Sequence, residues 1–189
     1  MILNTIRDDH FWRGIAGRLG FAGGLRTCIE FEYWRFTTKL AYIGLTDGDK
    51  TATRVGKGAN NPLVLADRPF SMVHPNFTVR VIERGKWLGI GFTSRGCQLE
   101  DGDTLGTQPN VLAGGYFCQD LPMLRTRFGR IPAPEIETGD LIRVSVDFGQ
   151  DSITWFRNSF KVGTVHISLT SDIYPVVNLS HHASVSIVP

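Results

Sequence analysis

Short, closely spaced strands dominate residues 138–187 of the 189-residue sequence. Over residues 142–148 apolar and polar side chains alternate, so that an extended segment has one apolar and one polar face. A turn at residues 149–151 and renewed alternation at Ile153 and Trp155 predict a β-hairpin. The remaining strand-like segments are 162–167, 173–179 and 183–188. Because no segment between them is long enough for a crossover helix, we expect these five strands to pair antiparallel.

The strand pattern extends towards the amino terminus. Ile29, Phe31 and Tyr33 alternate with glutamates and predict a half-buried strand over residues 26–33. Further predicted strands cover residues 40–45, 51–55, 62–66, 77–83 and 87–93. We therefore expect an all-β domain.

The first residues differ from this pattern. Asp8 or Asp9 is a suitable cap for a short helix that ends at Gly20. We expect residues 1–24 to form a helical extension that packs on the domain, and the alternative is a detachable helix that binds a partner. A chain of this length fits one domain with a core of its own, which we place at residues 25–189.

Charge and cysteine content exclude several classes of function. A formal net charge of +2 is too small to predict a nucleic-acid or anionic membrane partner. The acidic pair Asp8 and Asp9 interrupts any signal peptide, and no apolar stretch reaches membrane-spanning length. Cys28, Cys97 and Cys118 are odd in number and lack CxxC spacing, which indicates reduced thiols. We therefore expect a cytoplasmic protein.

Two ordered sets of residues point to known families. The first set, between residues 51 and 96, comprises Ala52, Arg54, Arg68, Pro69, Phe77, Val79, Val81, Trp87, Gly89, Gly91 and Thr93. Its order and spacing resemble the first half of a neuralized homology repeat. The second set comprises Gly139, Asp140, Asp147, Trp155, Phe156, Arg157, Asn158, Gly163, Tyr174, Pro175 and Val177. It is similar to the closing half of a SPRY or B30.2 domain.

Both resemblances imply the same architecture, an antiparallel two-sheet β-sandwich of the concanavalin-like or jelly-roll SPRY type. Ser159 departs from the SPRY pattern, because the family has glycine at this position. A serine tolerates positive φ less readily than glycine, so we expect this turn to be reshaped or mildly strained. Trp87 and Trp155 lie in alternating apolar strands and are expected in the core.

Residues 94–134 are rich in glycine and proline, and we expect a long irregular segment there, with a strand inside it as the alternative. Its aromatic and arginine side chains are of the types that are frequent at binding sites. The alternatives are that the aromatics pin the segment to a sheet and that the arginines are solvated. With the family positions and a histidine pair at a turn, the candidate partner-binding residues are Arg54, Arg68, Tyr116, Phe117, Arg125, Arg127, Arg157, His181 and His182.

The family resemblance implies a protein–protein interaction module that binds a short peptide segment of a partner through loops at one end of the sandwich. In these families such a module often selects substrates for a ubiquitin ligase, so ligase components are implied partners. The alternative is a carbohydrate-binding lectin, because lectins share the architecture. Against it, the sequence shows no convergent set of Asp, Asn and aromatic residues.

The sequence does not predict an enzyme. It contains no GxSxG elbow, P-loop or HExxH motif, and its histidines do not reach zinc-ligand spacing with the cysteines. Cys97 or Cys118 becomes a nucleophile only if the fold brings a histidine to it. We therefore expect no cofactor and no metal.

Overall fold

The computed structural model describes residues 34–37, 42–56, 62–94, 112–118, 122–126, 129–169 and 172–189. These residues contain strands and no helix. The strands are β1 (Phe36–Thr37), β2 (Ile43–Thr46), β3 (Thr51–Arg54), β4 (Leu63–Ala66), β5 (Asn76–Glu83), β6 (Leu88–Ser94), β7 (Ala113–Cys118), β8 (Met123–Thr126), β9 (Gly129–Pro132), β10 (Leu141–Asp147), β11 (Ser152–Arg157), β12 (Phe160–His166), β13 (Ile173–Leu179) and β14 (Ser184–Ile187).

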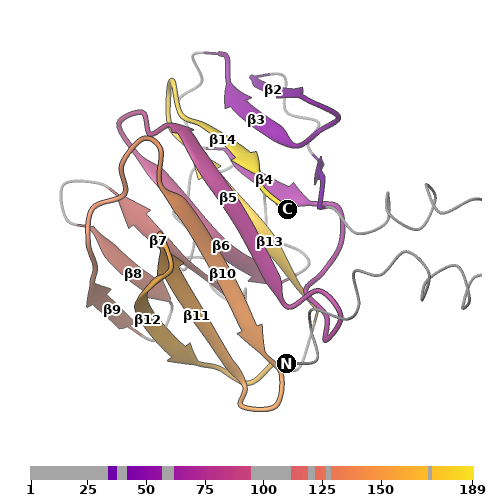
Figure 1. Cartoon of the computed structure of the whole chain (residues 1–189), viewed down its shortest axis with the longest axis vertical. Helices are drawn as coiled ribbons and strands as arrows, with labels where there is room; N and C mark the ends of the chain where they lie inside the picture. The colour runs from indigo at the N-terminus through magenta and orange to yellow at the C-terminus, as the bar shows by residue number, and fades with distance from the viewer. Residues whose placement is uncertain are drawn as a thin grey trace, which may run out of the picture. The chain divides into compact units, whose positions relative to one another are not determined.

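The strands form two seven-stranded sheets that face each other as a sandwich (Figure 1). One sheet has the order β1-β4-β13-β6-β7-β8-β9, and we call it the β6 sheet. The other has the order β12-β11-β10-β5-β14-β3-β2, and we call it the β10 sheet. Neighbouring strands pair antiparallel throughout. The predicted all-β sandwich is therefore confirmed.

The five strands predicted between residues 138 and 187 appear as β10 to β14, close to the expected bounds. Local alternation is clearest in β10, which buries every second side chain, whereas β13 is buried on both faces. Their sheet membership was not visible in the sequence: β13 lies in the β6 sheet, whereas β12 and β14 lie in the β10 sheet. The predicted amino-terminal helix, the strand at residues 26–33 and the domain boundary at residue 25 lie outside the described residues.

The expectation of an irregular segment over residues 94–134 was wrong, because β7, β8 and β9 lie within it. Its glycines serve close packing between strands. A Cβ atom on Gly91 would come within 1.9 Å of the carbonyl oxygen of Gly114 on the neighbouring strand. Glycine therefore allows β6 and β7 to approach closely here, whereas in the sequence it reads as a loop signal.

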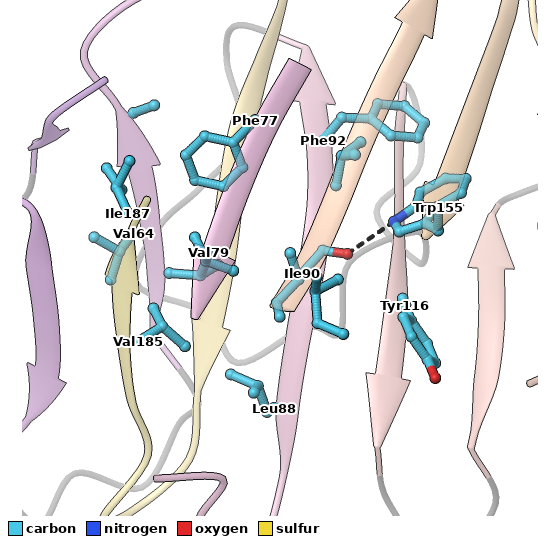
Figure 2. Close-up of a cluster of buried hydrophobic side chains, with 14 of the residues drawn as sticks. Val64, Phe77, Val79, Leu88, Ile90, Phe92, Tyr116, Trp155, Val185 and Ile187 are labelled. Carbon is cyan, nitrogen blue, oxygen red and sulfur yellow. Dashed lines mark hydrogen bonds between the residues drawn. The ribbon is translucent and has the colours of Figure 1, made fainter. Parts of the chain in front are cut away.

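The main core lies between the two sheets. Figure 2 shows its centre, where Trp155 of β11 points towards β6 and its indole nitrogen donates to Ile90 O at 3.0 Å. Its ring also packs against Phe92, with ring centroids 5.9 Å apart. The side chain of Trp155 is fully buried. Trp155 therefore joins the two sheets both by ring packing and by a hydrogen bond from its indole nitrogen.

A smaller apolar cluster includes Leu63, Trp87, Phe117 and Val176. Val176 belongs to this cluster, whereas its neighbour Val177 belongs to the main core. Because successive strand residues point to opposite faces, the smaller cluster lies on the outer face of the β6 sheet. Trp87 is buried as predicted, but in this cluster rather than between the sheets.

Candidate functional site

One end of the sandwich combines connections from both sheets, and we call it the Met72 end. Its described segments are residues 67–75 between β4 and β5, residues 148–151 between β10 and β11, and residues 167–169 after β12. Backbone hydrogen bonds hold these segments together. Val146 N donates to Pro75 O at 2.9 Å, and Ile167 N donates to Asp151 O at 2.9 Å.

An aromatic cluster anchors the base of the loop at residues 67–75. The Phe70 ring is buried and lies edge-to-face with Trp34, with centroids 5.6 Å apart. Trp34 also packs on Phe77 and donates from its indole nitrogen to Asn76 O at 3.0 Å. The loop therefore starts and ends at fixed points of the core.

The tip of this loop is a tight turn that displays two apolar side chains. Ser71 N donates to His74 O at 3.2 Å, and His74 N donates to Ser71 Oγ at 3.0 Å. These reciprocal bonds close the turn around Met72 and Val73. Their exposed fractions are 82% and 80%, so neither side chain contributes to the core.

An open hollow of about 360 Å³ lies beside this tip. It is lined by Met72, Pro75, Ser145, Val146, Asp147, Phe148 and Gly149. Its far wall is held rigid, because Asp147 Oδ1 accepts hydrogen bonds from Gly149 N at 2.9 Å and Gln150 N at 3.0 Å. Such a side-chain cap fixes the turn in one conformation.

The opposite end, which we call the Asp140 end, is built from polar contacts. The buried carboxylate of Asp140 accepts hydrogen bonds from Glu137 N at 2.7 Å, Arg157 Nε at 2.6 Å and Asn158 Nδ2 at 2.6 Å. Burial alone raises the pKa of Asp140, but these bonds and the charge of Arg157 outweigh it and hold the pKa below its usual value. Asp140 therefore orders this end, and Arg157 is its ion-pair partner.

Arg54 also makes structural contacts at the Asp140 end. It is 5% exposed, and its Nη1 donates to Leu179 O at 3.1 Å. Its Nε donates to Gly56 O at 3.3 Å, and the guanidinium lies over the Tyr42 ring. Arg54 thus links β3 to the end of β13.

The two candidate aromatics lie inside the structure. Tyr116 is fully buried and donates its hydroxyl to Pro134 O at 2.5 Å, and burial raises its pKa to about 12. Phe117 packs on Trp87 in the outer cluster, with ring centroids 5.6 Å apart. These positions match the alternative in which the aromatics pin the segment to the sheet.

The remaining candidates are spread over the molecule. Arg68 lies in the loop of the Met72 end and pairs with Asp67 at 3.0 Å. Arg125 lies on β8, and Arg127 is outside the described residues. His181 and His182 form the turn between β13 and β14, at the Asp140 end.

The structure therefore does not bring the predicted set together at one end, and a binding role for these residues stays a prediction. Sequence reasoning missed Met72 and Val73, although a signal was present: two adjacent apolar residues stand in a loop bounded by Pro69 and Pro75. The turn at residues 149–151 was predicted, with Phe148 at the end of the preceding strand. That this turn lies beside the loop of Met72 follows from the pairing of β5 with β10.

The described residues show no group of three or more His, Cys, Asp and Glu side chains arranged to hold a metal ion. Cys118 is a free and buried thiol whose pKa burial raises to about 11. It is protonated at neutral pH, unlike an activated nucleophile. Cys28 and Cys97 lie outside the described residues.

Comparison with known proteins identifies the fold family. Residues 76–189 match the family model of the SPRY domain. The chain belongs to the SPRY domain family. SPRY domains are protein–protein interaction modules, which agrees with the predicted class of function. The likeness to B30.2 and neuralized repeats is compatible with this result and stays a prediction.

Similar proteins support this SPRY assignment. The chain is 24% identical over 161 residues to Ran-binding protein 10 of Danio rerio and to Ran-binding protein 9 of Xenopus tropicalis, with 77% of this chain covered in both cases. It spans 25% and 27% of their lengths. The TRIM65 PSpry domain matches with a TM-score of 0.70 at 14% identity, covering 88% of this chain and 96% of that one. A human SPRY domain matches with a TM-score of 0.63 at 18% identity, covering 80% and 95%.

The described part of the chain contains no helix that could span a membrane.

Proposed function

We propose that this SPRY domain binds a short peptide segment of another protein at the Met72 end. The observation that carries the proposal is the pair Met72 and Val73, both more than three-quarters exposed at the tip of an anchored turn. Adjacent exposed apolar side chains at a rigid turn are a feature of binding surfaces rather than of folding.

The hollow beside the tip suits an apolar side chain of such a peptide. Pro75, Val146 and Phe148 offer apolar surface to it, and the volume of about 360 Å³ is near the lower limit for ligand pockets. Because the turn and the Asp147 cap are preorganised, little conformational entropy is lost on binding. The exposed carboxylates of Asp147 and Asp151 favour a peptide with a basic residue next to the apolar one.

Among the residues predicted from sequence, Arg68 lies in the same loop as Met72, and we include it in the proposed surface. Arg54 and Arg157 hold the Asp140 end, so we expect their substitution to act first on folding.

A peptide selection on the whole chain tests the proposal. A random peptide library displayed on phage should yield an enriched motif with the native chain, and the double substitution Met72→Ser and Val73→Ser should abolish the enrichment. Val55→Ser is the matched control, because Val55 is 66% exposed but lies beside Arg54 at the Asp140 end. Loss of enrichment with the control as well, or none with the native chain, contradicts the proposal.

The lectin alternative is tested by a glycan array with the same variants. Selective sugar binding without peptide enrichment would replace the peptide proposal. A role as the substrate-recognition part of a ubiquitin ligase in the cytoplasm extends the proposal and rests on the family resemblance alone. It predicts that cytoplasmic ligase components co-purify with the chain.

A further inference from the structure

A second hollow lies along one side of the sandwich, between the last strands of the two sheets. β9 ends the β6 sheet and β12 ends the β10 sheet, and both lie on the same side of the molecule (Figure 1). The hollow between them measures about 290 Å³. It is lined by Leu124, Thr126, Gly129, Arg130, Ile131, Thr164, Val165 and His166. We call it the edge groove.

Among the described strands, β12 pairs with β11 on one side only, and its other edge faces this groove. Ile167 N donates to Asp151 O, and along the β11–β12 ladder Val165 faces Ile153. In antiparallel pairs, hydrogen-bonded residues alternate with residues whose N–H and C=O groups point away from the partner strand. Thr164 and His166 therefore direct their backbone groups away from β11, and both line the edge groove.

The edge of β9 is different. Ala133 N donates to Pro122 O at 3.1 Å, so the same alternation directs the backbone of Arg130 and Pro132 away from β8. Proline has no N–H group, and proline on an edge strand blocks the addition of another strand. The edge of β12 can thus accept a further strand, whereas the proline on β9 prevents strand addition there, and β9 forms a wall of the groove.

Basic residues lie around the groove. Arg130 lines it, whereas Arg125 on β8 alternates with the lining residues Leu124 and Thr126 and faces the outer side of the β6 sheet. Within the described part of the chain neither guanidinium forms an ion pair with a carboxylate. Lys161 and His166 on β12 are exposed, and the described residues that line the groove include no Asp or Glu.

We propose that the edge groove is a second docking site, in which an extended acidic peptide segment of a partner protein adds a strand to the free edge of β12. Its backbone pairs with Thr164 and His166. Its apolar side chains point between the sheets towards the exposed Ile131. Its acidic side chains alternate with them and point outward beside Lys161, and Arg130 adds positive charge from the other wall of the groove. Pairing between two copies of this chain is disfavoured, because it would bring two basic rims together.

The test uses the whole chain and a short acetylated peptide in which Glu alternates with Val. Amide hydrogen exchange measured by NMR should slow at Thr164 and His166 when the peptide binds. Val165 serves as the internal control, because its amide already bonds to β11. A matched peptide with Lys in place of Glu should not bind. Methylation of the backbone nitrogens that face β12 should abolish binding while the protein is unchanged.

Two protein variants complete the test. Arg130→Glu should weaken binding of the Glu-Val peptide by at least about tenfold. Its control Arg80→Glu reverses an exposed charge on β5 and should have no effect, since two strands separate β5 from β12. Thr164→Pro should abolish binding, because it removes an edge donor that makes no bond to β11. If this variant does not fold, the methylated peptide answers the same question.

Met72→Ser with Val73→Ser should leave this binding intact, which separates the edge groove from the Met72 end. Equal binding of the Lys peptide, or unchanged exchange at Thr164 and His166, overturns the proposal. So does a dimer in sedimentation that Thr164→Pro converts to a monomer, since a second copy would then occupy the edge.

Discussion

The two ends of the sandwich differ in the side chains that their fixed backbone holds in place. At the Asp140 end, the charged side chains of Asp140 and Arg54 are buried and hydrogen-bonded within the chain, although the apolar side chains of Val55 and Phe160 are exposed there. At the Met72 end, the backbone is equally well fixed, but apolar side chains face the solvent. The comparison teaches that charged residues at family positions can serve the fold, while the proposed partner surface consists of side chains that the fold does not use.

The largest expected effect comes from the centre of the Asp140 end. Asp140→Ala should lower the free energy of unfolding by about 2–4 kcal/mol, because it leaves Arg157 and two other donors without their shared acceptor. Urea denaturation measures this change. The control is Glu137→Ala, whose exposed carboxylate lies 3.8 Å from Arg157 and should contribute less than about 0.5 kcal/mol. Equal losses in the two variants would contradict the assignment.

Acid should weaken the same network. The pKa of Asp140 lies below its ordinary value of 3.8, so its stabilising contribution is complete above that pH and is lost as the pH falls through the folded value. The stability difference between the native chain and Asp140→Ala should therefore be constant at neutral pH and shrink in acid. Denaturation at a series of pH values measures it, and a difference that persists unchanged into strong acid would rule out this role.

A smaller effect of opposite sign is expected at the neighbouring turn. Ser159 has a φ of 73° and follows Asn158 with a φ of 48°, so the mild strain expected from sequence is present. Ser159→Gly should stabilise the chain by about 0.5–1 kcal/mol, since glycine adopts positive φ without strain. Thermal unfolding measures the gain. A loss of stability would show instead that the serine side chain is needed there.

The smallest effect on folding is expected at the Met72 end. Met72→Ser combined with Val73→Ser should change the free energy of unfolding by less than about 0.5 kcal/mol, because both side chains are already solvated. The same denaturation measurement applies. A large loss would place these residues in the core and remove the contrast between the two ends.

Sequence alone located the strands from β10 to β14, because alternation and turn chemistry are local properties of the chain. It also predicted a reshaped or mildly strained turn at Ser159 from one departure from a family pattern. It did not find β7, whose glycines indicate a loop unless the close approach of Gly91 to Gly114 is known. Nor could it separate Tyr116 as a core residue from Tyr116 as a contact residue, since burial depends on the facing sheet.

The sequence by itself determined the positions of β2 to β6 and of β10 to β14. Only the tertiary structure decided how those strands are distributed between the sheets, as when Ser184 of β14 pairs with Thr53 of β3 across most of the chain. The physical reason is that alternation is encoded within one strand, whereas partners, free edges and exposed tips follow from long-range pairing. The exposure of Met72 and the open edge of β12 belong to this second group.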